Sequence, residues 1–155
     1  MHLLLFTLDS HRFALPLDRV REIVHAVEIT PLAGAPGVVE GVVEGVVDVR
    51  GAVVPVLDVR ARFRLPARPV RLSDHLVLAE GAGRLVALRV DRAVGMEEVP
   101  PEAMTMPGAN DPAMAHLAGV VTLDDGMVLV HDLDAFLSQA EADALARALA
   151  TEAAA

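Results

Sequence analysis

The chain has 155 residues, a formal net charge of −9 and no cysteine. This length predicts one domain, the negative charge argues against a nucleic-acid partner, and the lack of cysteine excludes disulfides and thiolate metal sites. Hydrophobic residues make up 54% of the chain, yet no run approaches the ~18 apolar residues of a membrane-spanning helix. The N-terminal stretch lacks the basic region of a signal peptide, so we expect a cytoplasmic protein without membrane insertion. The excess apolar residues are expected to form the core and a surface that faces a protein partner.

The first residues predict a hairpin followed by a short helix. Leu3–Leu8 and Arg12–Leu17 flank a short polar connection, which is typical of two paired strands. Asp18 is a favourable N-cap residue, and apolar residues at helical spacing after it predict one or two turns of helix. Val27–Thr30 then favours a return to extended structure.

A tandem repeat follows, in which Val38–Gly41 (Val-Val-Glu-Gly) recurs at once as Val42–Gly45. Four residues is an even number, so the extra copy leaves every following side chain on its original face of a strand. We expect the first copy to bulge out as a loop while the second copy carries the strand pairing.

The centre of the chain predicts a hairpin whose turn exposes charged side chains. Val46–Val49 and Val53–Val59 are short and β-branched, as strands are. Arg50 and Gly51 separate them, and glycine supplies the positive φ that tight hairpin turns need. Asp48 and Arg50 are two residues apart, so on one strand they would share a face.

Residues 60–72 are basic and interrupted by prolines, and we interpret them as a crossing between two halves of the chain. Five arginines gather here with a single aromatic residue: Arg60, Arg62, Arg64, Arg68 and Arg71. An RNA-binding arm has this composition on a small scale, but the global acidity favours a solvated loop.

The second half predicts further strands. His75–Ala79 and Leu85–Val90 form a hairpin, Val94–Val99 forms a single strand, and Leu117–Leu123 and Met127–His131 form another hairpin. Residues 102–114, which hold several prolines and polar turn formers, predict a long exposed loop.

A faint internal repetition relates the two halves. Gly51-Ala52-Val53-Val54 with Asp58 compares with Gly126-Met127-Val128-Leu129 with Asp132. The even spacing of the hairpins agrees with two similar small β units.

The chain closes with a helix from about Gln139 into the alanine-rich end at residue 155. Ser138 and Glu141 have the spacing of a capping box, and Leu145 and Leu149 should face the body of the protein.

No strong catalytic or cofactor pattern is present. The six histidines are scattered, and no pair has the spacing of a helical zinc site. His131 beside Asp132 could act as a base with its orienting acid, so one alternative is a small-molecule or metal-binding β-barrel, possibly a hydrolase. We expect no cofactor, no metal and no enzymatic activity.

A longer pattern runs from Gly45 to Phe63: Gly-x-x-Asp-x-Arg-Gly-x-x-x-Pro-x-x-Asp-x-Arg-x-x-Phe. It resembles the central signature of the CheW family of chemotaxis coupling proteins, which more often has Asn in place of Asp48. Segments that resemble the family in the expected order extend from about residue 3 to residue 138.

The resemblance implies a mainly β fold with two side-by-side five-stranded β-barrels, a short helix near the N-terminus and a C-terminal helix. Residues 1–138 would form the CheW-like domain, with crossings between its two subdomains near 10–20 and 60–75. Residues 139–155 would form the C-terminal helix and tail.

The resemblance also implies a function. The protein would be a non-enzymatic adaptor that couples the cytoplasmic tips of methyl-accepting chemoreceptors to the regulatory domain of a CheA-type histidine kinase. The receptor tip would enter the groove between the barrels, and one barrel would contact the kinase domain of the same fold. A chemotaxis-like signalling system that controls a response other than swimming fits the sequence equally well.

The resemblance carries receptor-facing positions over to this chain. They are Val20, Glu22, Gly45, Asp48, Arg50 and Gly51. We expect Glu22, on the predicted short helix, to meet Arg50 at the central turn, and we expect exposed apolar side chains near the turns at Gly51 and Gly126.

Overall fold

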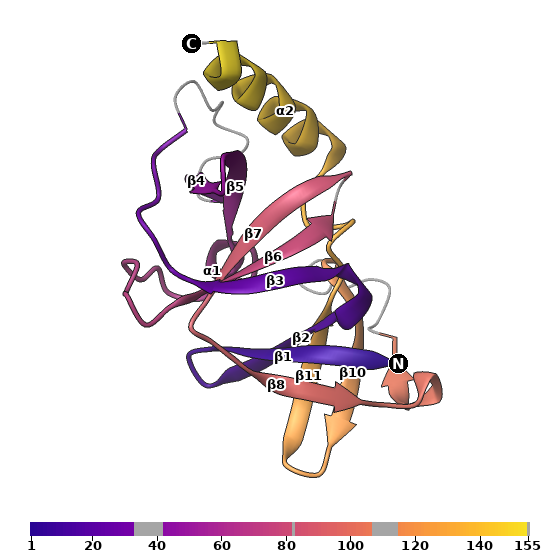
Figure 1. The fold of residues 1–155 in the computed structure, drawn as a ribbon. Helices are drawn as coiled ribbons and strands as arrows, with labels where there is room; N and C mark the ends of the chain where they lie inside the picture. Colours follow the sequence, from indigo (N-terminus) through magenta and orange to yellow (C-terminus); the bar gives the residue numbers. More distant parts are fainter. Residues whose placement is uncertain (33–41, 82, 107–114, 155) are drawn as a thin grey trace.

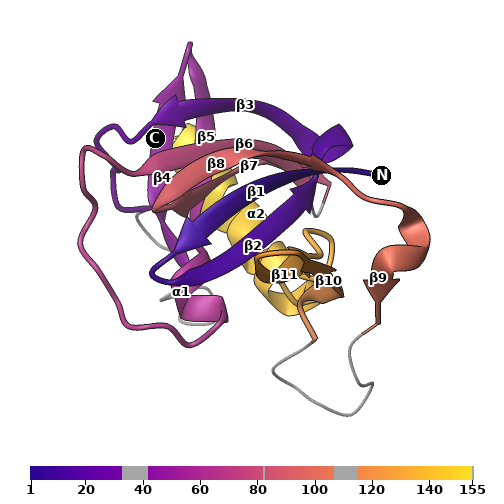
Figure 2. The ribbon, with the colours of Figure 1, turned by 90° about the horizontal axis from the view of Figure 1, so that it is seen from below.

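The structure is a computed structural model that describes residues 1–32, 42–81, 83–106 and 115–154. The described residues form two mixed β-sheets, of six and five strands, together with short helical turns and a C-terminal helix (Figure 1). The six-stranded sheet has the order β8-β1-β2-β11-β10-β9, and the five-stranded sheet has the order β3-β6-β7-β5-β4. Seen from below in Figure 2, β11, β10 and β9 follow one another across the six-stranded sheet.

The strands of the six-stranded sheet are β1 (His2–Leu8), β2 (His11–Pro16), β8 (Arg92–Glu98), β9 (Met104–Thr105), β10 (Leu117–Leu123) and β11 (Gly126–His131). Those of the five-stranded sheet are β3 (Val20–His25), β4 (Val43–Val49), β5 (Ala52–Asp58), β6 (His75–Gly81) and β7 (Arg84–Val90). The helical elements are η1 (Leu17–Arg19), α1 (Val59–Arg62), η3 (Pro101–Ala103) and α2 (Gln139–Ala154). All predicted hairpins are confirmed, and η3 and β9 lie where the sequence predicted only a loop.

The prediction of two β units is confirmed as two mixed sheets, but only one of them has the predicted five strands. The other has six, because the short β9 adds to its edge. Their closure into barrels remains a prediction. The chain passes from one sheet to the other at η1 and again at Asp91, between β7 and β8. Residues 60–75, expected as a crossing, connect β5 to β6 within the five-stranded sheet.

The two sheets repeat one arrangement. From the isolated bridge at Thr30, the five-stranded sheet runs through β4, β5, β7 and β6 to β3; from β9, the other runs through β10, β11, β2 and β1 to β8. Each contains one parallel contact, β5 with β7 and β2 with β11. Asp58 and Asp132 both accept a hydrogen bond at 3.0 Å from the backbone N–H two residues later. The predicted internal repetition is therefore confirmed, with the first copy continuous and the second assembled from both ends of the chain.

The predicted short helix near the N-terminus is confirmed, but it ends before the residues that were expected to form it. Only the three residues of η1 are helical, and the following Val20–His25 forms β3, which pairs with β6. Pro16, and not Asp18, occupies the N-cap position, and it makes no side-chain capping bond. Alternating burial along β3 fits a strand, and β-branched Val20, Ile23 and Val24 favour that state once β6 is available as a partner.

The tandem repeat is described only in its second copy. Residues 38–41 lie outside the described residues, while Val43 and Gly45 pair with Leu57 and Val56 of β5. The prediction that the second copy carries the pairing is confirmed.

One buried cluster joins the two sheets to α2. It contains Phe6 and Phe13 of the six-stranded sheet, Val77 and Leu88 of the five-stranded sheet, and Leu145 of α2. Each sheet also covers a smaller cluster of its own on its other face. The uninterrupted apolar run of β1 follows from this arrangement, because its alternate side chains face two different cores.

The C-terminal helix begins as the sequence predicts. The backbone N–H of Ser138 donates to Glu141 Oε1 at 2.9 Å, and the Ser138 hydroxyl accepts from the Glu141 N–H at 3.1 Å. This reciprocal pair is a capping box. Leu145 is fully buried and Leu149 packs against the shared cluster, as expected.

The basic segment after β5 is not a solvated loop. The side chain of Arg60 is only 2% exposed, and those of Arg62 and Arg68 are 15% and 12% exposed. Arg62 donates to both carboxylate oxygens of Glu141 and lies over the Phe136 ring, so α1 is tied to α2. The interpretation of this stretch as solvated is wrong for these three arginines.

Arg60 holds the two sheets together. Its guanidinium donates to both oxygens of Asp9, in the β1–β2 turn, at 2.8 and 3.0 Å. It also donates to both oxygens of Asp91, at the passage from β7 to β8, at 2.8 and 2.9 Å. Burial alone would raise the pKa of Asp91, but the hydrogen bonds from Arg60, from the Asp9 N–H and from Arg68 lower it to about 2.

We predict that Arg60→Ala destabilises the protein severely. Removing one partner of a buried ion pair leaves the others uncompensated, which typically costs ~3–5 kcal/mol of the free energy of unfolding. Urea unfolding measures this loss directly. Arg71→Ala, an exposed arginine of the same segment, is the matched control and should change the free energy of unfolding little; equal effects of the two substitutions would contradict the role of Arg60.

Candidate interaction surface

The turn between β4 and β5 has the geometry of a tight hairpin. Val49 pairs with Ala52, which leaves Arg50 and Gly51 as the turn residues, with φ of +50° and +87°. Positive φ at both positions matches the twist of the flanking strands. The Gly51 N–H donates to Asp48 Oδ1 at 2.8 Å, which stabilises the turn. The predicted reversal is confirmed, but Arg50 lies in the turn, so the strand alternation that should place it beside Asp48 does not apply.

Arg50 forms a two-pronged ion pair with Glu22, which lies on β3. Its Nη1 donates to Glu22 Oε1 at 3.0 Å, and its Nη2 donates to Oε2. The hydrogen bonds from Arg50 lower the pKa of Glu22. The Arg50 side chain is 72% exposed, so most of the guanidinium faces solvent. The predicted meeting of the two residues is confirmed, although Glu22 reaches Arg50 from a strand and not from a helix.

These two residues meet because the five-stranded sheet brings its two ends together. β3 and β4 are its opposite edge strands, and Thr30, beyond β3, exchanges two backbone hydrogen bonds with Val46 of β4 at 2.8 and 2.9 Å. Gly45 permits this approach, since a Cβ there would lie 2.2 Å from the Thr30 carbonyl oxygen. Gly45 is buried, so it lies beneath this surface and not on it.

The structure therefore brings four of the six expected residues to one surface: Glu22, Asp48, Arg50 and Gly51. Val20 is half-buried and packs against the shared core, separated from Glu22 by a bulge in the β3–β6 pairing.

Exposed apolar side chains accompany both hairpin turns. Val53 is 57% exposed and lies opposite Asp48, and Ile23, next to Glu22, is 41% exposed. Met127, beside Gly126 at the second turn, is 61% exposed. This location agrees with the expectation for the two turns. Val53 and Ile23 were missed as individual residues, because Val53 opens a continuous apolar run that does not show which side chains face outward.

The second turn carries an ion pair that sequence reasoning missed. Arg12 of β2 donates to both oxygens of Asp125, in the β10–β11 turn, at 2.9 Å each. At each hairpin tip an ion pair between an arginine and a carboxylate thus links the turn to another strand. The turn supplies the arginine in the first case, at Arg50, and the carboxylate in the second, at Asp125. No local spacing signals a pair so far apart in the sequence.

His131 is a core residue and not a general base. Its side chain is fully buried between Phe63 and Phe136, with ring centroids 5.1 and 5.0 Å away, and among the described residues neither ring nitrogen has a hydrogen-bond partner. Burial, and to a smaller extent electrostatic repulsion from His116 and Arg62, lowers its pKa to about 3. The Asp132 carboxylate accepts hydrogen bonds from the backbone N–H groups of Asp134 and Ala135 and does not orient the ring. The hydrolase alternative is therefore wrong.

Within the part of the chain that the structure describes, no three His, Asp or Glu side chains are grouped so that they could hold a metal ion. No helix of those residues has the length and apolar character needed to cross a membrane.

Residues 2–141 match the model of the CheW-like domain. The chain belongs to the CheW-like family. It is 28% identical over 147 residues to the chemotaxis protein CheW of Rhizobium meliloti, covering 92% of this chain and 90% of that protein. It is 25% identical over 146 residues to the chemotaxis protein CheW of Klebsiella aerogenes, covering 89% and 82% of the two chains.

The fold is also similar to the crystal structure of the scaffolding protein TtCheW from Thermoanaerobacter tengcongensis. The TM-score is 0.77 at 23% identity, covering 88% of this chain and 87% of that one. Membership of the CheW-like family makes this protein a non-enzymatic scaffold of chemotaxis signalling.

We predict that His131 makes the fold sensitive to mild acid. In the unfolded chain its ring binds a proton below pH ~6.5, whereas the folded ring stays neutral down to about pH 3, so the free energy of unfolding falls as the pH drops below ~6.5. His131→Leu removes the two unpartnered nitrogens and should lose this part of the pH dependence. Urea unfolding of both proteins between pH 7 and 4 measures it; parallel pH profiles would contradict the prediction.

We predict that Gly45→Ala disrupts the contact between the two ends of the five-stranded sheet. The new Cβ would overlap the Thr30 carbonyl, and overpacking of this kind costs ~1–3 kcal/mol. Amide hydrogen exchange at Val46, whose N–H bonds Thr30, should accelerate. Gly51→Asn is the control, because space around Gly51 is open and Asn tolerates positive φ; unchanged exchange in Gly45→Ala would show that the contact is not needed.

Proposed function

We propose that this scaffold couples the cytoplasmic tips of methyl-accepting chemoreceptors to the regulatory domain of a CheA-type histidine kinase, in the cytoplasm. The observation that carries the proposal is the exposed Glu22–Arg50 pair at the hairpin of the family signature. The Arg50 guanidinium is charged, held in place by Glu22 and open to solvent. A group of this kind is suited to recognition of a protein partner.

In this proposal residues 1–138 act as the coupling module. Each sheet closes into a small barrel, a view supported in the five-stranded sheet by the backbone bonds between Thr30 and Val46 at its two ends. A receptor helical hairpin lies in the groove between the barrels, against Glu22, Asp48, Arg50 and Gly51, with Val20 and Gly45 shaping the surface from below. One barrel contacts the kinase domain of like fold.

An exposed apolar residue beside the charged pair supports a protein partner. Val53 lies opposite Asp48 and is 57% exposed. Apolar side chains next to an arginine are typical of the centre of an interface, where arginine contributes strongly to affinity.

We predict that Arg50→Ala weakens receptor binding about tenfold while the melting temperature stays nearly unchanged. The ion pair is exposed, so its loss affects the surface and not the core. Binding of purified variants to receptor fragments and to the kinase regulatory domain, drawn from the same genome, measures the effect; kinase binding should persist.

Arg21→Ala is the matched control, since Arg21 also lies on β3 and pairs with a carboxylate, Glu80, at the surface. The double exchange Glu22→Arg with Arg50→Glu should restore the pair without restoring receptor binding if the guanidinium position matters to the partner. Unfolding of Arg50→Ala, or equal binding by all variants, would overturn the proposed receptor surface.

A further inference from the structure

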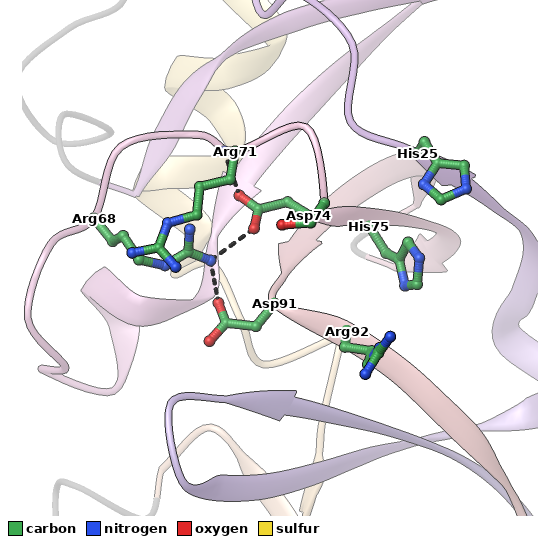
Figure 3. A pocket seen from close by; sticks show the side chains of 8 residues that line it. His25, Arg68, Arg71, Asp74, His75, Asp91 and Arg92 are labelled. Carbon is green, nitrogen blue, oxygen red and sulfur yellow. Dashed lines mark hydrogen bonds and ion pairs between the residues drawn. The ribbon is translucent and has the colours of Figure 1, made fainter.

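A pocket of about 470 Å³, lined by charged and polar residues, opens beside the end of β3. In Figure 3, His25, His75 and Arg92 lie together on one side of this pocket, and Arg68 lies on the other, with Asp74 and Asp91 between them. The pocket is formed where β3, β6 and the start of β8 meet the loop before β6.

The two carboxylates of the pocket already accept hydrogen bonds from arginine side chains. Asp74, whose side chain is 1% exposed, accepts from Arg68 at 2.7 Å and from Arg89 at 3.2 Å. Asp91 accepts from Arg60 and from Arg68. Figure 3 shows both carboxylates turned toward Arg68, and within the described residues neither forms a direct ion pair with Arg92 or the two histidines.

That other side presents hydrogen-bond donors without an acceptor. The exposed Arg92 guanidinium makes no hydrogen bond or ion pair within the described residues. His75 Nδ1 accepts the Ala93 backbone N–H at 2.9 Å, so in the neutral ring Nε2 carries the proton and is a donor. The His25 ring packs edge-on against His75, with centroids 5.1 Å apart.

The surroundings of His75 disfavour an added positive charge. Burial lowers the pKa of His75, and the neighbouring His25 and Arg92 lower it further, against a smaller opposing effect of the Asp74 carboxylate. A bound anion would relieve this repulsion and accept the free N–H groups.

We propose that Arg92, His75 and His25 form a binding site for the phosphate group of a small phosphorylated molecule. A planar guanidinium can donate two parallel bonds to one phosphate, and the ring N–H groups supply further donors. The pocket volume exceeds that of a phosphate alone and lies in the range of small-molecule sites, so it leaves room for the group that carries the phosphate. His25 and Glu22 are three apart on β3 and point to opposite faces, so the site is independent of the receptor surface.

The test follows the ring signals of His25 and His75 by NMR at constant pH and ionic strength, with EDTA present to exclude a metal bound to the histidines. The probes are inorganic phosphate, O-phosphoserine and, as a carboxylate, acetate. Saturable shifts with both phosphate probes and none with acetate support the site; tighter binding of O-phosphoserine assigns it to a phosphomonoester, and equal binding assigns it to free phosphate.

Arg92→Gln should weaken phosphate binding about tenfold, as expected for loss of a charge-assisted hydrogen bond. His75→Asn, which keeps an acceptor for the Ala93 N–H, should also weaken it. Arg71→Gln removes a charge from the far rim near Arg68 and should leave binding nearly unchanged. No saturable shift, equal binding of acetate, or an equal loss in Arg71→Gln would overturn the proposal.

Discussion

The structure depends on one buried guanidinium. Arg60 leaves β5 through α1 and reaches two carboxylates, Asp9 and Asp91, which belong to a turn of one sheet and to the passage between the sheets. Neither sheet alone could bury Arg60, because its charge would lack a counter-charge. The pairing therefore requires both sheets in one relative position. Arg68 extends the network to Asp74, so the long segment after α1 is also held by charge and not by regular secondary structure.

The repeated sheet order explains how one chain presents two similar surfaces. The first copy is continuous from β3 to β7, whereas the second is completed by β1 and β2, which join β8 to β11 from the other end of the sequence. Both hairpin tips are tied to another strand by an arginine and a carboxylate, yet the charges are exchanged between Arg50 and Asp125. The two turns also differ in backbone, because Arg50 and Gly51 have positive φ whereas Asp124 and Asp125 do not, so the two hairpin tips are related but not equivalent surfaces.

Local signals predicted the elements, and long-range contacts escaped prediction. Turn residues such as Gly51 and Gly126 marked the hairpins, and the capping box marked the start of α2, because both depend on neighbours in the sequence. The assignment of hairpins to sheets depends on the parallel contacts of β2 with β11 and β5 with β7, which no local pattern encodes. Asp18 suggested a helix that pairing with β6 overrides. In the candidate site, the family resemblance indicated the Glu22–Arg50 pair, while spacing alone could not, and Arg60 was hidden in a run of similar charges.

Burial decides what an arginine and a carboxylate do in this protein. The same pairing holds the fold at Arg60, where water is excluded, and leaves the fold almost untouched at Arg50, where the side chain is 72% exposed. An exposed ion pair is weak because water and salt compete for it. Glu22 therefore positions the Arg50 guanidinium but leaves part of it open to solvent. A partner can then add its own acceptors to the free edge of that guanidinium at little cost in desolvation. In the proposed function, stability therefore depends on the buried Arg60 and recognition on the exposed Arg50, so the two properties are carried by different arginines.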